Sequence, residues 1–178
     1  GSEGLRSVLD QLAGWLAPAA VWPELLEARL GNAERIRIEP LVRGGFVEWR
    51  GWRLGATRVL GFAPPDVAGV VLPCRAGELE GLAARVVQFL SEKGASFLHQ
   101  IPGALDSPPA AVDEALWELT WRGWVTNDSL VAAQRAGPGR GRPTPGLGRW
   151  SVVAAARAGK RDDDVCRILR VLLSRYGF

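Results

Sequence analysis

Apolar residues at helical spacing, interrupted by glycine and proline, dominate the first part of this chain. Leu5, Leu9, Leu12 and Leu16 recur every three or four residues, and Pro18 cannot continue that helix. The run that follows Gly45 is instead rich in aromatic and β-branched residues with glycines between them, which is typical of a hairpin. The predicted elements are helices over residues 5–16 and 24–30, a helix with a break near Glu39, and a hairpin over residues 46–62.

Prolines close this first set of elements. Pro64 and Pro65 interrupt the pattern, and the short apolar run over residues 67–72 predicts a further strand or an extended connector that ends at Pro73. Three helices followed by a hairpin is the order of a winged helix, although no short strand is visible between the first two helices.

The same order is predicted a second time. The expected elements are a helix over residues 78–93, a short helix capped by Ser96 and ended by Pro102, and a helix that begins near Pro108 and ends at Gly123. Strands are expected over residues 124–126 and 150–155, and the aperiodic glycine, proline and arginine residues between them predict a long basic wing over about 135–149.

These patterns predict a mostly α (α+β) fold of tandem winged-helix modules with short β-hairpins. The first module is expected over residues 3–75 and the second over residues 76–155. Residues 161–178 predict an amphipathic helix that either packs back on this chain or begins a further, truncated module.

The third helix of the second module is apolar on two sides. Leu116 and Leu119 share a core-facing side, whereas Trp117 and Trp121 fall on the opposite side. Acids accompany the two tryptophans, and phosphates would repel them, so this helix is a poor reader of a DNA groove. We therefore predict that Trp117 and Trp121 form a protein interface.

The composition excludes several classes of protein. A hydrophobic fraction of 47% is ordinary for a soluble globular protein. The sequence has no run of about 18 apolar residues that could cross a membrane and no signal segment, so the chain is expected to be cytoplasmic. It begins Gly1-Ser2 and contains no methionine, which predicts a piece of a longer protein. Two cysteines and the single His99 form no metal-ligand pattern, and no phosphate loop or nucleophile-base pair is present. We expect no metal, no cofactor and no enzyme activity in this segment.

The arginines are the strongest functional signal in a chain whose net charge is +3 and whose pI is about 9.4. Glycine and proline separate the arginines of the wing, which suits an arm that reaches phosphates, although a basic loop that only stays solvated has the same composition. The predicted nucleic-acid-binding residues are Arg135, Arg140, Arg142 and Arg149 in the wing, and Arg35, Arg37, Arg43, Arg50, Arg53 and Arg58 on the third helix and hairpin of the first module.

One stretch also resembles a known family. Residues 115–136, ALWELTWRGWVTNDSLVAAQRA, together with Gly148-Arg149-Trp150-Ser151, are similar to the C-terminal region of the large helicase-related (Lhr) proteins, which are superfamily 2 DNA helicases. Weaker similarities lie at residues 45–51, 94–98 and 172–177. The resemblance implies that the parent is an ATP-dependent, 3′-to-5′ translocating helicase of DNA repair.

In that family, winged-helix modules precede a β-barrel that is similar to bacterial DNA glycosylases, so the resemblance places motor and barrel outside this segment. The implied partners are single-stranded or duplex DNA, an RNA–DNA hybrid, and neighbouring domains of the helicase. An architectural module that docks on its neighbours or self-associates is the alternative. A free-standing winged-helix transcription regulator is disfavoured by the acids of the third helix of the second module.

Overall fold

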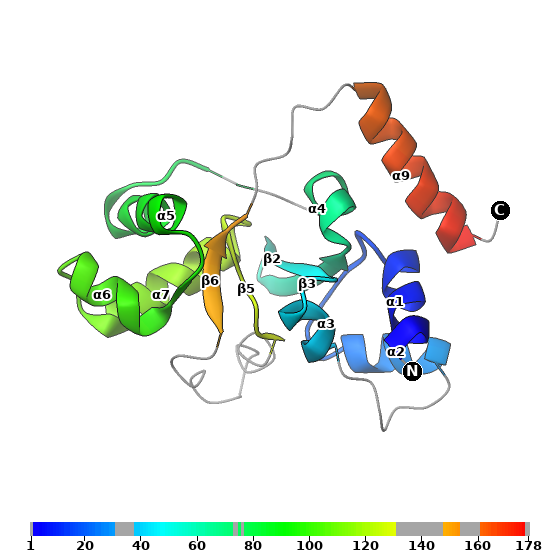
Figure 1. Ribbon diagram of the computed structural model, residues 1–178, viewed down its shortest axis with the longest axis horizontal. Helices are drawn as coiled ribbons and strands as arrows, with labels where there is room; N and C mark the ends of the chain where they lie inside the picture. The colour runs from blue at the N-terminus through cyan, green and yellow to red at the C-terminus, as the bar shows by residue number, and fades with distance from the viewer. Residues whose placement is uncertain are drawn as a thin grey trace.

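Two antiparallel sheets of three strands each organise the chain (Figure 1). The structure, a computed structural model, describes residues 2–30, 38–72, 75, 77–130, 148–153 and 161–176. The first half contains α1 (Ser2–Gln11), β1 (Leu16–Ala17), α2 (Trp22–Leu30), α3 (Glu39–Arg43), β2 (Glu48–Leu54), β3 (Thr57–Ala63) and α4 (Pro65–Val71). The second half contains α5 (Gly81–Lys93), β4 (Ser96–Phe97), the 3-10 helix η2 (Leu98–Gln100), α6 (Ile101–Ala104), α7 (Pro109–Thr120), β5 (Val125–Asn127) and β6 (Arg149–Val152). The last described element is α9 (Arg161–Tyr176).

The two halves repeat one arrangement. In each, a helix precedes a two-residue strand, helical segments follow, and two antiparallel strands complete the sheet. The strand orders, β1-β3-β2 and β4-β6-β5, are equivalent. The prediction of a mixed α and β fold is confirmed, and the structure adds a first strand to each half that the sequence patterns did not reveal.

The first of these strands replaces the end of a predicted helix. α1 stops at Gln11 instead of continuing to Leu16, and Leu16 and Ala17 pair with Gly61 and Leu60 of β3. Gly14 makes the turn with a φ of +80°, at a place where a Cβ atom would lie 2.9 Å from the carbonyl oxygen of Val71. The helical spacing of the leucines extends to Leu16, although the backbone there already forms a strand that pairs with β3.

The second new strand corrects the short helix expected from Ser96. Ser96 and Phe97 pair with Trp150 and Arg149 of β6, and the helical turns begin only at Leu98. Pro102 lies in the first turn of α6 and does not end a helix. That position suits proline because the N–H groups of a first helical turn have no partner within the helix.

The strand or connector predicted over residues 67–72 is a helix. Pro64 is the N-cap of α4 and Pro65 occupies its first turn. Ala68 and Leu72 are buried against Ala13 and Ala63. The valines of this segment favoured a strand, but the spacing of its two buried residues is helical.

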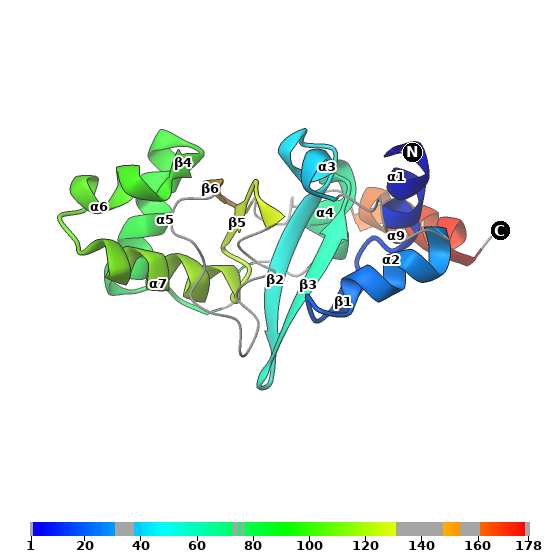
Figure 2. The same cartoon turned by 90° about the horizontal axis from the view of Figure 1, so that it is seen from below.

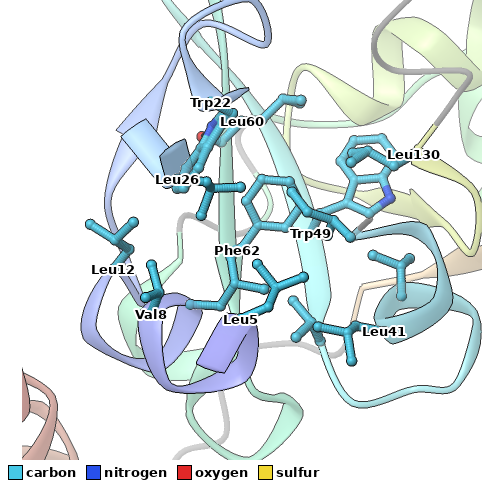
Figure 3. Close-up of a cluster of buried hydrophobic side chains, with 14 of the residues drawn as sticks. Leu5, Val8, Leu12, Trp22, Leu26, Leu41, Trp49, Leu60, Phe62 and Leu130 are labelled. Carbon is cyan, nitrogen blue, oxygen red and sulfur yellow. The ribbon is translucent and has the colours of Figure 1, made fainter. Parts of the chain in front are cut away.

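Each half has its own hydrophobic cluster. Figure 3 shows the cluster of the first half. In the first half the Trp22 and Phe62 rings meet edge to face at 4.7 Å, and Trp22 Nε1 donates a hydrogen bond to the Leu60 carbonyl oxygen. Leu130, which follows β5, lies in this same cluster beside Trp49. The first core therefore includes a residue from the second half of the chain.

The halves meet where β2 faces β5 and the end of α7 (Figure 2). Trp49 Nε1 donates a hydrogen bond of 2.6 Å to the Asn127 carbonyl oxygen, and the Thr126 hydroxyl donates to the Trp49 carbonyl oxygen. A Cβ atom on Gly51 would lie 2.8 Å from the Trp121 ring, so glycine permits this close approach.

The last described helix packs on the first half, beside α1 and α4 (Figure 1). Arg175 of α9 donates hydrogen bonds to the carbonyl oxygens of Gln11 and Ala13, and Val171 contacts the small cluster under α4. Of the two expectations for this helix, the described contacts support packing on this chain. None of the described helices is both long and apolar enough to cross a membrane.

Candidate nucleic-acid interface

Two arginines of the hairpin in the first half, Arg53 and Arg58, contact residues of the second half. Arg53 and Arg58 lie opposite each other on β2 and β3. Arg53 forms an ion pair of 2.9 Å with Glu118 of α7, and the guanidinium carbon of Arg58 lies 5.3 Å from the centre of the Trp121 ring. Both side chains remain exposed, and such a surface ion pair holds an arginine only weakly. These two arginines therefore border the junction of the halves and are still accessible to a ligand.

Arg50 cannot take the surface role that the sequence predicted for it. Its side chain is 1% exposed, and its Nε donates to Glu48 at 2.7 Å. It lies opposite Gly61, which has no side chain. The Leu72 and Leu16 side chains fill the position that a Cβ atom on Gly61 would need. The prediction rested on the hairpin position of Arg50, whereas Leu16 and Leu72 pack beside its partner Gly61 and help to bury this part of the hairpin.

Arg43 stands at the end of α3, exposed and paired with Glu39 at 3.1 Å. Glu39 has further partners, because its carboxylate accepts hydrogen bonds from the Ser129 hydroxyl at 2.9 Å and from the Leu130 backbone N–H at 2.7 Å. This acid therefore ties α3 to the segment after β5. Sequence patterns gave no signal for that role, since the partners lie ninety residues away along the chain.

Arg149 is the first residue of β6, in the sheet of the second half. Asp128 holds it with an ion pair of 2.8 Å from Nε, and a hydrogen bond joins the backbone N–H of Arg149 to the same carboxylate. The side chain is still 51% exposed. The other predicted arginines, Arg35, Arg37, Arg135, Arg140 and Arg142, lie outside the described residues.

Trp117 of α7 and Trp121, its C-cap residue, face the junction. Trp121 is 4% exposed and belongs to the core cluster of the first half, and Trp117 packs against the clusters of both halves. Their rings stack at 5.9 Å, and Trp117 meets Trp150 edge to face at 5.2 Å. The face of α7 that carries them is covered by protein and does not offer its rings to a base.

An exposed aromatic pair that the sequence patterns did not predict lies at the start of η2. Phe97 and His99 stack with ring centres 5.6 Å apart and ring planes 15° apart. A signal was present in the sequence, because two aromatic rings on either side of an apolar Leu98 can lie on one outer surface when Leu98 is buried. Among the described residues, no cluster of three His, Cys, Asp or Glu side chains could hold a metal ion.

Comparison with known proteins identifies relatives of the whole segment. The chain is 31% identical over 176 residues to a Mycolicibacterium smegmatis protein described as "Lhr helicase/ probable uracil glycosylase"; the match covers 89% of this chain and 12% of the relative. It is 29% identical over 225 aligned residues to the Escherichia coli "Lhr helicase/uracil glycosylase", with 99% and 14% covered. The chain thus spans about an eighth of the length of these relatives. No family model matches it.

Proposed function

Because this chain belongs to the Lhr family of helicases, we propose that it is a pair of winged-helix modules that bind and position nucleic acid within an ATP-dependent DNA-repair helicase. The motor that hydrolyses ATP and translocates 3′ to 5′ would occupy another part of the parent protein. The glycosylase in the names of both relatives would also lie elsewhere. This segment would carry no catalytic residue and no cofactor.

The observation that carries the proposal is the repeated order of elements. A helix, a short strand, two or three helical segments and a strand pair occur twice, with equivalent strand orders in the two sheets. Helix-turn-helix folds place their recognition helix in the DNA groove, and flanking elements contact the backbone. This chain repeats the unit twice, has a net charge of +3 and is related to a helicase. These three properties support nucleic acid as its partner.

We infer the parts of the surface that would make contact from burial and exposure. α7 holds the recognition position of the second module, but its tryptophan face is covered by the first half. Contact would therefore come from the exposed arginines Arg43, Arg53 and Arg58 in the first half and Arg149 in the second. The wing arginines, which lie outside the described residues, would join them as the sequence predicts. Phosphate contacts of this kind give binding that is strongly salt-dependent and nearly independent of sequence.

An architectural role is the second candidate, and the junction favours it. Trp121, Leu130 and Glu39 tie the halves together, which is what a rigid spacer between the domains of a large protein requires. In this alternative the arginines would be incidental. The two functions differ in one measurable property, the affinity of the chain for nucleic acid.

The test is fluorescence anisotropy with labelled single-stranded and duplex DNA at salt concentrations of about 50 and 200 mM. We expect binding at the lower concentration that weakens steeply at the higher one. The variant Arg140→Ala/Arg142→Ala/Arg149→Ala should weaken binding and reduce the slope of log K against log salt by up to about 0.9 for each phosphate contact that duplex DNA loses. No binding by the unmodified chain at either salt concentration would reject the nucleic-acid function and leave the architectural one.

A charge-matched control separates a local surface from net charge. Arg29→Ala/Arg167→Ala/Arg170→Ala also removes three positive charges, but from α2 and α9 at the far side of the first half. We expect this control to bind nearly as well as the unmodified chain. If only Arg43→Ala/Arg53→Ala/Arg58→Ala weakens binding, the first half is the contact; equal losses in all three variants would mean that only net charge matters.

A further inference from the structure

An exposed aromatic stack stands at the edge of the second sheet. β4 is an outer strand of the order β4-β6-β5, and Phe97 is its last residue. The Phe97 ring lies nearly parallel to the imidazole of His99, with the ring centres 5.6 Å apart. Phe97 is 38% exposed and His99 is also exposed. Flat rings in solvent are the surfaces on which nucleic-acid bases stack.

Neighbouring residues hold this pair in place. Leu98, between the two rings, is buried in the core of the second half and anchors the turn. The Phe97 backbone N–H donates a hydrogen bond of 2.7 Å to Gln100 Oε1, which fixes the start of η2. A base that stacks here would meet a preformed surface, so binding would cost less side-chain entropy than ordering two free rings.

An arginine is paired with Phe97 on the neighbouring strand. Arg149 lies directly opposite Phe97 on β6, and residues paired in this way extend from the same face of a sheet. Their neighbours Ser96 and Trp150 are buried, so Phe97 and Arg149 occupy the outer face. Asp128 engages Nε of Arg149, which is one of the five N–H donors of a guanidinium. The ion pair therefore orients the group and leaves it able to meet a phosphate.

We propose that Phe97, His99 and Arg149 form a platform for single-stranded nucleic acid, on which an unpaired base extends the Phe97–His99 stack while Arg149 contacts the adjoining phosphate. The inference rests on the proposed nucleic-acid function and specifies its ligand. An unpaired base offers both of its faces, whereas neighbouring bases cover them inside a duplex. Stacking is insensitive to base identity, so the platform would hold a strand without reading its sequence.

A second exposed phenylalanine supplies a matched comparison. Phe46 in the first half is 49% exposed, but the guanidinium carbon of Arg6 lies 4.6 Å from the centre of its ring. One face of this ring is thus already covered by a cation. Phe46 has no stacked aromatic neighbour among the described residues, and a base would find there neither a second ring nor a preformed stack.

The only histidine of the chain makes the platform directly observable. Its imidazole Cε1–H gives a single NMR signal, which a base stacked on the pair should shift upfield through its ring current. We expect this shift when a short oligodeoxyadenylate is added, and none with an abasic strand of the same length and charge. An unmoved signal in a sample where anisotropy shows the oligodeoxyadenylate to be bound would overturn the platform.

Affinities give the second measurement. Phe97→Ala should weaken binding of the oligodeoxyadenylate about tenfold, the loss expected for one stacked base, and leave the abasic strand unaffected. Phe97→Leu, which keeps an apolar side chain at the sheet edge, should show the same loss, and Phe46→Ala should show none. Equal binding of both strands by the unmodified chain would reject the platform and retain the nucleic-acid function, whereas no binding of either strand would reject both.

Discussion

The two halves of this chain share one order of elements, yet their cores are not equally self-sufficient. Every residue of the second core cluster lies between residues 79 and 152, within the second half itself. The first cluster, in contrast, includes Trp121 and Leu130, which the second half contributes. Two units of the same topology thus differ in how far each depends on the other for burial of its apolar surface.

The third helices account for much of this difference. α7 has twelve residues and buries Leu116 and Leu119 in its own half while its tryptophans reach the other. α3 has five residues and buries Leu41 and Val42. A helix of little more than one turn covers little of a sheet, and the side chains of the second half complete the cover over Trp49. The first half should therefore lose more stability than the second when the junction is damaged.

Removing Trp121 should have the largest effect. Trp121→Ala takes a buried aromatic ring out of the first core, a change that typically costs about 3–5 kcal/mol. Urea denaturation should report this loss of unfolding free energy, and hydrogen exchange should show lost amide protection in α1 and α2 while α5 keeps its protection. Trp15→Ala, at a tryptophan that is 44% exposed, is the control and should cost much less. If α5 loses protection as far as α1 does, the two halves unfold as one unit and the asymmetry is wrong.

A smaller effect is expected from adding one methyl group at the junction. Gly51→Ala would place a Cβ atom within 3 Å of Trp121 and Thr120, and such overpacking typically costs about 1–3 kcal/mol. Gly69→Ala in α4 adds the same group where no atom lies within 4 Å, and it should stabilise by about 0.5–1 kcal/mol because alanine favours a helix. Thermal or urea unfolding of the two variants measures this contrast in sign. A neutral Gly51→Ala would show that the junction can open at little cost.

The sequence patterns were most informative where local and tertiary signals agree. The structure contains the helix predicted over residues 24–30 and the hairpin after Gly45, and the helix predicted over residues 78–93 begins at Gly81. At these places the apolar spacing and the strand-forming residues agree with the packing. The predictions at Leu16 and Val67 were wrong. Leu16 pairs with β3 instead of continuing a helix, and Val67 lies in a helix that begins at Pro65 instead of in a strand. A two-residue strand such as β4 has no period from which it could be recognised.

The candidate site was less accessible to prediction than the fold. The sequence pattern placed the arginines on the hairpin but did not reveal that Arg50 is buried there, whereas Arg53 and Arg58 are exposed. Glu39 and Ser129 are brought together only by the packing of the two halves. The sequence places Phe97 and His99 on either side of Leu98, but their stacking and their exposure become known only from the structure.

The smallest expected effect concerns a carboxyl group on α1, in the half whose core is incomplete by itself. Burial raises the pKa of Asp10 above its ordinary value of 3.8, nearby Arg6 lowers it, and Asp66 raises it further. A raised pKa means that the folded chain holds this proton to a higher pH than the unfolded chain does. The contribution of protonated Asp10 to the free energy of unfolding is therefore fully present below pH 3.8. It is lost as the pH rises through the pKa of the folded chain.

Asp10→Asn removes that loss. At neutral pH we expect the variant to be more stable than the unmodified chain by less than about 1 kcal/mol, because solvent screens so exposed a group. Below pH 3.8 the gain should vanish, since both folded and unfolded chains then carry the neutral acid. Urea denaturation at the two pH values measures the difference, and Glu27→Gln on α2 controls for net charge. A gain of equal size at both pH values would mean that the asparagine acts through its shape, and that the charge of Asp10 does not oppose folding of the first half.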